Sequence, residues 1–236
     1  MMSVQLLDLP IPLLARIAAL VSKGNRCVYG VFPFQVIASC SELKALMPLQ
    51  KCCRKLHEAS QLALGGLNLA PMQWSHSIRG LESVARLALS LPCLAELRML
   101  PTPGPIPELL EQVKDLKCLE IMERPVGCRG SWGVIEHFPS VHSLRELIVG
   151  KPFTKENVAN LLSFRYECLT TLHFVDNDSV PPIPQRILNR LETFIIEEGA
   201  SDAGNENEIL LNLTNAPLLS NLRVPNGICD SLSKLP

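Results

Sequence analysis

Apolar residues recur along the chain with a spacing of three and then two. The pattern is clearest in LTTLHFVDN (residues 169–177), where Leu169 and Leu172 are followed by Phe174. A helix would repeat every three to four residues and an exposed strand would alternate strictly, so neither fits. The same apolar-x-x-apolar-x-apolar pattern occurs in seven segments: LGGLNL from Leu64, LAELRM from Leu94, LKCLEI from Leu116, LRELIV from Leu144, LTTLHF from Leu169, LETFII from Leu191 and LSNLRV from Leu219.

The first positions of these segments are 30, 22, 28, 25, 22 and 28 residues apart. Such a period predicts short strands that stack side by side, because one unit alone cannot cover its apolar face. Apolar spacing between the strands predicts helices over 77–91, 107–116, 154–164 and 205–217, with Thr154 as an N-cap and Pro217 as a stop. Proline-rich stretches at 101–107 and 181–184 are predicted connectors.

In this pattern residues 62–236 resemble the leucine-rich-repeat family, in its longer strand-plus-helix subtype. The resemblance implies an α/β fold, a leucine-rich-repeat solenoid of about seven repeats, with short parallel strands and helices on the convex side. The family's turn asparagine is present at Asn177. The other repeats are degenerate and carry different residues there: Met72, Thr102, Arg124, Pro152, Gly199 and Gly227.

The first 61 residues predict a small helical segment. LLDLPIPLLARIAALV (6–21) has helical spacing behind Pro10 and Pro12, and SELKALMPLQKCCRKLHEA (41–59) indicates two helical pieces broken near Pro48. A repeat array needs its open edge covered, so a plain capping bundle is one interpretation of this segment.

The same segment also resembles an F-box motif. LPIPLLARI (9–17) matches its first part and CCRKL (52–56) its second, with residues 22–40 as a long insertion that would loop out. The resemblance implies that a Skp-type adaptor binds around Leu9, Pro10, Leu13, Leu14 and Ile17. The chain would then be the substrate-recognition subunit of an SCF-type ubiquitin ligase. The alternative is a leucine-rich-repeat scaffold whose helical front end is a cap without a ubiquitin role.

Strand alternation predicts a row of side chains that face away from the core. They form either a solvated sheet face or a recognition strip on the concave side, where repeat proteins bind partners. Its acidic residues favour a basic partner peptide. The predicted strip comprises Glu96, Arg98, Cys118, Glu120, Glu146, Ile148, Thr171, His173, Thr193, Ile195, Glu197, Asn221 and Arg223.

Composition narrows the classes of function. Only 5% of residues are aromatic whereas 41 are leucine, so leucine must fill the interior. The net charge of −1 without a basic block argues against nucleic acid, and no long apolar run predicts a membrane span. The 9 cysteines include no C-x-x-C pair, which favours reduced, buried thiols in an intracellular protein rather than zinc ligands or disulfides.

Motifs for chemistry are missing from the sequence. It has no phosphate-binding glycine loop, no G-x-S-x-G and no H-E-x-x-H, and its histidines lie in different predicted segments. We therefore expect no catalytic residue, metal or cofactor, and a monomer that works within a larger complex. We expect a cytoplasmic location, with the nucleus left open. SLSKLP (231–236) echoes the run before an earlier strand, which predicts an array that ends truncated or without a cap.

Overall fold

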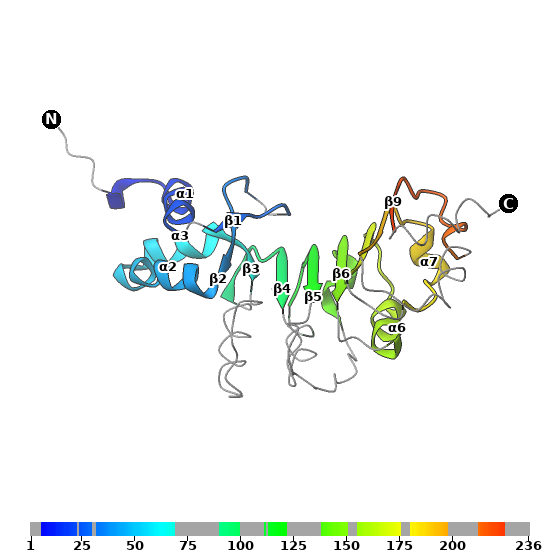
Figure 1. Ribbon diagram of the computed structural model, residues 1–236. Coiled ribbons are helices and arrows are strands. Elements are labelled where there is room, and N and C mark those ends of the chain that lie inside the picture. The colour runs from blue at the N-terminus through cyan, green and yellow to red at the C-terminus, as the bar shows by residue number, and fades with distance from the viewer. Residues whose placement is uncertain are drawn as a thin grey trace. The chain divides into compact units, whose positions relative to one another are not determined.

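The chain folds as a mixed α/β protein that divides into two compact units, Met1–Met99 and Leu100–Pro236 (Figure 1). In both units the strands are mostly parallel. The computed structural model describes residues 6–22, 24–29, 32–68, 90–99, 111, 113–121, 138–150, 155–175, 180–197 and 212–224.

The first unit combines a small helical bundle with a sheet. Strands β1 and β2 are antiparallel, and β2, β3 and β4 are parallel to one another in chain order. Its elements are η1 (Leu6–Asp8), α1 (Ile11–Ser22), β1 (Asn25–Arg26), β2 (Val36–Ser39), α2 (Cys40–Cys52), α3 (Arg54–Ala63), β3 (Leu64–Asn68) and β4 (Glu96–Met99).

Helix α1 packs against α3 through small side chains. Leu14 and Ala15 of α1 form one buried cluster with Leu56 and Ala59 of α3, and Leu9 packs against its edge. Alanines let the two helix backbones approach closely, so the bundle needs few large side chains. The predicted helix behind Pro10 is confirmed by α1.

The break between the next two helices lies at Cys53, so the predicted break near Pro48 is wrong. Helix α2 runs through Pro48, and Cys53 is extended at φ −164° and ψ 164° before α3 begins. A proline inside a helix removes one hydrogen bond but does not necessarily end it. Cys53 also packs against the bundle core, which gives the extended residue a fixed place.

The F-box resemblance required the segment 22–40 to loop out. This segment does not loop out. It contains β1 and β2, and β2 pairs in parallel with β3, with Ile37 opposite Gly66. The physical reason is the apolar run from Val36 to Ala38, whose side chains are all buried. The first strand of the predicted repeats, β3, therefore lies in one compact unit with the helices.

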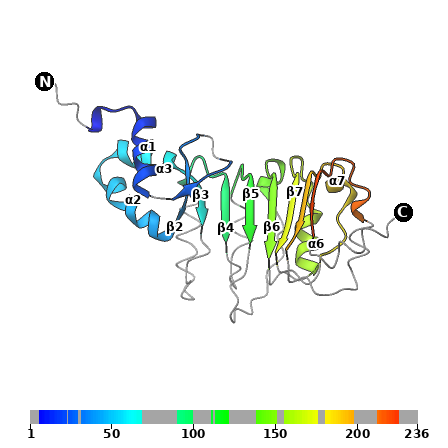
Figure 2. The ribbon, with the colours of Figure 1, turned by 45° about the horizontal axis from the view of Figure 1, so that its top comes forward.

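The second unit carries five parallel strands in chain order, β5 to β9. Figure 2 shows β5, β6 and β7 next to one another. Helix α6 connects β6 to β7, and α7 connects β7 to β8. The elements are β5 (Cys118–Ile121), η2 (Pro139–His142), β6 (Glu146–Gly150), α6 (Lys155–Ser163), β7 (Thr171–Val175), α7 (Gln185–Leu188), β8 (Thr193–Ile196) and β9 (Asn221–Arg223).

One hydrogen-bond arrangement recurs where the strands β6, β7, β8 and β9 begin. The carbonyl oxygen of Lys117 accepts the N–H groups of both Arg145 and Glu146, and the carbonyl of Arg145 accepts those of Thr170 and Thr171. The carbonyls of Thr170 and Glu192 each accept two N–H groups of the following strand in the same way. Successive strands are thereby held in one register.

The strands fall where the leucine spacing predicts them. Each of the seven apolar segments contains one of the strands β3 to β9, and the predicted helix at 154–164 is confirmed by α6. The core-facing positions are buried, among them Leu147, Leu172 and Phe194. The chain at 181–184 connects β7 to α7 without regular structure, as predicted.

Several predictions fall wholly or largely outside the described residues. They are the helices at 77–91 and 205–217, the cap at Thr154, the turn position of every repeat including Asn177, and the chain end at 231–236. The helix predicted at 107–116 is wrong over its last residues, since 113–116 are not helical and Asp115 has a φ of 61°.

Leu172→Ala should lower the free energy of unfolding by about 2–5 kcal/mol, because the fully buried leucine of β7 would leave a cavity. Urea unfolding followed by circular dichroism measures the change. Leu218→Ala, at an exposed leucine of the same unit, is the matched control and should stay within about 0.5 kcal/mol. Equal effects of the two substitutions would contradict the register described above.

Candidate protein-binding surfaces

The sheet of the second unit presents two rows of side chains on the face opposite its core. We call these rows, together with Glu197, the sheet strip. The pairing register aligns the first row as Cys118, Glu146, Thr171, Thr193 and Asn221. It aligns the second row as Glu120, Ile148, His173, Ile195 and Arg223. The structure thus brings together all ten of the predicted strip residues of β5–β9.

Burial differs along the strip. Arg223 is exposed, Cys118 is buried, and the other members of the two rows are half-buried. Glu120 and Glu146 also interact with other groups of the chain. The half-buried members can therefore offer a partner apolar contact at the isoleucines and hydrogen bonding at the threonines.

His173 lies at the centre of the second row, between Ile148 and Ile195. Its side chain is 16% exposed, and Nε2 lies 3.1 Å from Oε1 of Glu197, whose side chain is 55% exposed. The two atoms are at ion-pair distance but outside hydrogen-bond geometry. Glu197 directly follows β8, and its N–H donates to the carbonyl of Phe174 at 2.9 Å, which fixes its backbone beside β7.

Glu96 of β4 does not face a partner, which corrects its predicted place on the strip. It is only 2% exposed. Oε1 of its carboxylate accepts the N–H of Tyr29 at 2.7 Å and the thiol of Cys27 at 3.1 Å. Residues between β1 and β2 therefore cover this carboxylate. Arg98, also predicted for the strip, lies two residues further along β4 in the first unit and is half-buried.

Two glycines of β3 make room for this cover. A Cβ on Gly65 would lie 2.7 Å from Sγ of Cys27, and a Cβ on Gly66 would lie 3.0 Å from Cβ of Glu96. The covering segment is also anchored by the buried Gln35, whose amide donates to the carbonyl of Leu62 at 2.9 Å. This contact was not predicted from the sequence. Its available signal was the glycine pair in LGGLNL, where the other six segments carry side chains.

The predicted adaptor-binding residues of the first unit divide into two groups. Leu14 is buried in the bundle core, and Leu9 packs against it. Pro10 and Leu13 are exposed, and Ile17 is half-buried. Leu13 is 40% exposed and Leu20, which the predicted set did not include, is 78% exposed. Leu9 and Leu14 thus support the helix, whereas the others lie where a partner could contact them.

Further exposed aliphatic residues lie near this helix face. They are Leu6 and Leu7 in η1 and Val21 at the end of α1. Together with Pro10, Leu13, Ile17 and Leu20 they form what we call the α1 face. The sequence carried a usable signal, because α1 has apolar residues on its exposed side and only one charged residue, Arg16, whereas an ordinary surface helix has one polar face.

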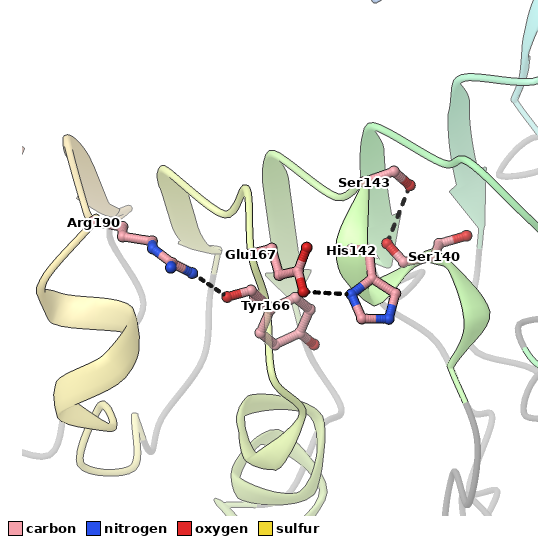
Figure 3. A network of polar contacts seen from close by, with 6 residues as sticks. All are labelled: Ser140, His142, Ser143, Tyr166, Glu167 and Arg190. Carbon is pink, nitrogen blue, oxygen red and sulfur yellow. Dashed lines mark hydrogen bonds and ion pairs between the residues drawn. The ribbon is translucent and has the colours of Figure 1, made fainter.

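A polar network lies beside the strands of the second unit (Figure 3). Nη1 of Arg190 donates to the carbonyl of Tyr166 at 2.8 Å, and the Ser143 hydroxyl donates to the carbonyl of Leu116 at 2.8 Å. His142 Nδ1 lies 3.0 Å from Oε1 of Glu167, with both side chains exposed. Since its part-buried contacts end on backbone carbonyls, the network joins neighbouring segments of the unit.

The part of the chain that the structure describes contains neither a candidate metal site nor a candidate membrane span. No group of three or more His, Cys, Asp or Glu residues there could hold a metal ion. Likewise, none of its helices has both the length and the apolar character needed to cross a bilayer.

Comparison with models of known protein families finds no match, and comparison with curated proteins finds none.

Glu96→Ala should speed amide hydrogen exchange at Tyr29, because the substitution removes the acceptor of that N–H. The lost hydrogen bond to a charged group should cost about 1.5–3 kcal/mol of local stability. Hydrogen exchange followed by NMR measures it residue by residue. Glu192→Ala, an exposed carboxylate of the other unit, is the control. An unchanged Tyr29 amide would show that Glu96 does not hold the segment.

Tyr166→Phe should alter how stability depends on pH. Burial raises the pKa of the Tyr166 phenol, with a smaller opposing effect of Arg186. The folded state therefore keeps a proton that the unfolded chain loses above about pH 10, so the phenol's contribution to stability falls as the pH rises further. Below pH 10 the variant should be less stable by about 1 kcal/mol, because the hydroxyl donates to the carbonyl of Leu161. Urea unfolding at pH 8 and pH 11 should show this difference shrinking, and a constant difference would contradict it.

Proposed function

We propose that this protein is a non-enzymatic, protein-binding subunit with a separate binding surface in each unit. The α1 face of the first unit docks one protein, and the sheet strip of the second unit recognises another. The observation that carries the proposal is the exposed apolar side of α1. A protein that binds through both surfaces brings its two partners together and leaves any chemistry to them.

The α1 face supports docking because its exposure is costly without a cover. Leu13 and Leu20 are separated by two helical turns and lie on one side of α1, with Ile17 between them. Full burial of such a side chain stabilises a complex by about 1.5–3 kcal/mol. Contiguous exposed apolar patches of this kind mark protein interaction sites.

The partner at the α1 face that the F-box resemblance implies is a Skp-type adaptor. Pro10, Leu13 and Ile17 belong to both the resemblance and the α1 face, whereas Leu9 and Leu14 hold the helix in place. In this proposal the chain is the substrate-recognition subunit of an SCF-type ubiquitin ligase, located in the cytoplasm. The repeat pattern and the in-register parallel strands support a leucine-rich-repeat array as the part that recognises the target.

A second candidate is a leucine-rich-repeat scaffold whose helical front end is only a cap. The pairing of β2 with β3 favours it, because the helical segment then continues the sheet instead of forming a bundle of its own. The location of α1, α2 and α3 in one compact unit with β3 and β4 supports the same candidate. The two candidates differ in whether a partner covers the α1 face.

Leu13→Asp together with Leu20→Asp should abolish co-purification with a Skp-type adaptor. Two charges would enter an apolar interface while the buried side of α1 stays unchanged. Retention of the tagged full chain and of the double variant by immobilised adaptor is the measurement. A loss of at least tenfold is expected.

The control carries the same kind of substitution away from α1. Val28→Asp replaces a side chain that is 77% exposed and should leave retention unchanged. Circular dichroism verifies that each variant is folded. If the unsubstituted chain is not retained while a known F-box protein is, the ubiquitin-ligase proposal fails and the scaffold candidate stands.

A further inference from the structure

The first unit shows what kind of ligand a sheet face of this protein accepts. The residues that cover β3 and β4 belong to the chain itself, and Tyr29 donates its main-chain N–H to Glu96. Glu96 is the third residue of LAELRM, and Glu146 of the first row is the third residue of LRELIV. The two glutamates therefore occupy the same position of the apolar pattern. The segment that covers β3 and β4 is thus held by an acidic side chain, which accepts a hydrogen bond from the main chain of that segment.

The sheet strip of the second unit has matching chemistry on a larger surface. Three of its members are acidic: Glu120, Glu146 and Glu197. Between them lie Ile148 and Ile195, which flank His173 and are half-buried. Glu197 is exposed, whereas Glu120 and Glu146 are half-buried. Oε1 of Glu197 lies 3.1 Å from Nε2 of His173. Arg223, the basic member of the strip, lies beside Ile195 at the end of the second row, so three acidic side chains stand against one basic side chain. Acidic groups around the isoleucines complement a ligand that carries basic groups around an apolar side chain.

We propose that the sheet strip binds an extended polypeptide segment whose every second side chain faces the strip, with apolar and basic residues alternating among these facing side chains. This inference rests on the proposed function of the strip as a protein-binding surface and names the chemistry of its partner. An apolar side chain of the segment packs on Ile148, His173 and Ile195. Lysine or arginine side chains beside it reach Glu197 on one side and Glu146 on the other.

An extended segment suits this surface for a geometric reason. Neighbouring strands lie about 4.8 Å apart, and the two rows of the strip lie about 6.7 Å apart along each strand. Successive side chains on one side of an extended peptide are also about 6.7 Å apart. A segment parallel to the strands can therefore place one side chain on each row, with the apolar one on the second row.

The two kinds of contact should affect binding differently. Exposed charges at the margin of an interface mainly speed association and add selectivity, and salt weakens them. The half-buried isoleucines should instead determine how slowly the complex dissociates. Charge substitutions at Glu197 are therefore expected to act through association rate and ionic strength, and substitutions at Ile148 through dissociation rate.

Three synthetic peptides test the inference with the full chain. Each is twelve residues long and fluorescein-labelled. On one side of the extended peptide, isoleucine alternates with lysine, serine or glutamate, and serine fills the positions between these facing residues. Fluorescence anisotropy should give a Kd for the lysine peptide at least tenfold lower than for the other two. Ile148→Asp should weaken that binding at least tenfold, and Glu197→Lys at least threefold with a reduced salt dependence.

Glu156→Lys is the matched control, because it makes the same charge change at an exposed residue of α6 in the same unit. It should leave the Kd within twofold. Should Ile148→Asp prove unstable by thermal unfolding, Glu197→Lys still decides, since that side chain is exposed. An equal effect of Glu156→Lys and Glu197→Lys would mean general charge attraction and would overturn the inference.

Two other outcomes separate the inference from the proposed function. If the glutamate peptide binds best and Ile148→Asp still weakens it, the strip binds polypeptides but the inferred partner chemistry is wrong. If no peptide binds, or binding responds to neither Ile148→Asp nor Glu197→Lys, the strip is not a polypeptide-binding surface. Both the inference and that part of the proposed function then fail.

Discussion

The structure of the second unit depends on one shared hydrogen-bond acceptor before each of the strands β6 to β9. The carbonyl of Arg145, for example, holds two consecutive N–H groups, those of Thr170 and Thr171. Two donors on one oxygen leave the next strand no freedom to slide. A slip by a single residue would turn every core leucine toward solvent. The same contact that stabilises the sheet therefore decides which side chains form the core and which form the sheet strip.

This constraint explains why much of the fold could be predicted. Strand alternation and the position of the preceding leucine are local properties, so the spacing from Leu169 to Leu172 and Phe174 was enough to locate β7 and its partly exposed neighbours Thr171 and His173. Burial of Glu96 could not be predicted in this way, because it depends on residues 67 and 69 positions away in the sequence. Pro48 led to a wrong prediction of where the helix breaks. The steric effect of a proline is local, whereas the extended Cys53 is held by packing against the bundle.

Helix α1 shows a different limit of sequence reasoning. Its apolar residues lie on the exposed side as well as the buried side, so their periodicity identifies the helix but not the side that meets α3. Leu9 and Leu14 of the predicted binding set support the helix, whereas Leu20, outside that set, is among its most exposed residues. Alanines at positions 15, 18 and 19 mark the buried side, because only small residues allow the close approach to α3.

The contact between Glu96 and Tyr29 also restricts how this protein can change in length during evolution. Repeat proteins gain or lose whole repeats, since each unit touches only its neighbours. Here a residue of β4 holds a segment that precedes β3, and the glycines of β3 are shaped to that segment. A further strand with its connection, inserted between β3 and β4, would separate the carboxylate from its donors. Insertion or loss of a strand with its connection therefore keeps this contact only after β4, and β3 and β4 must stay together with the helical segment as one piece.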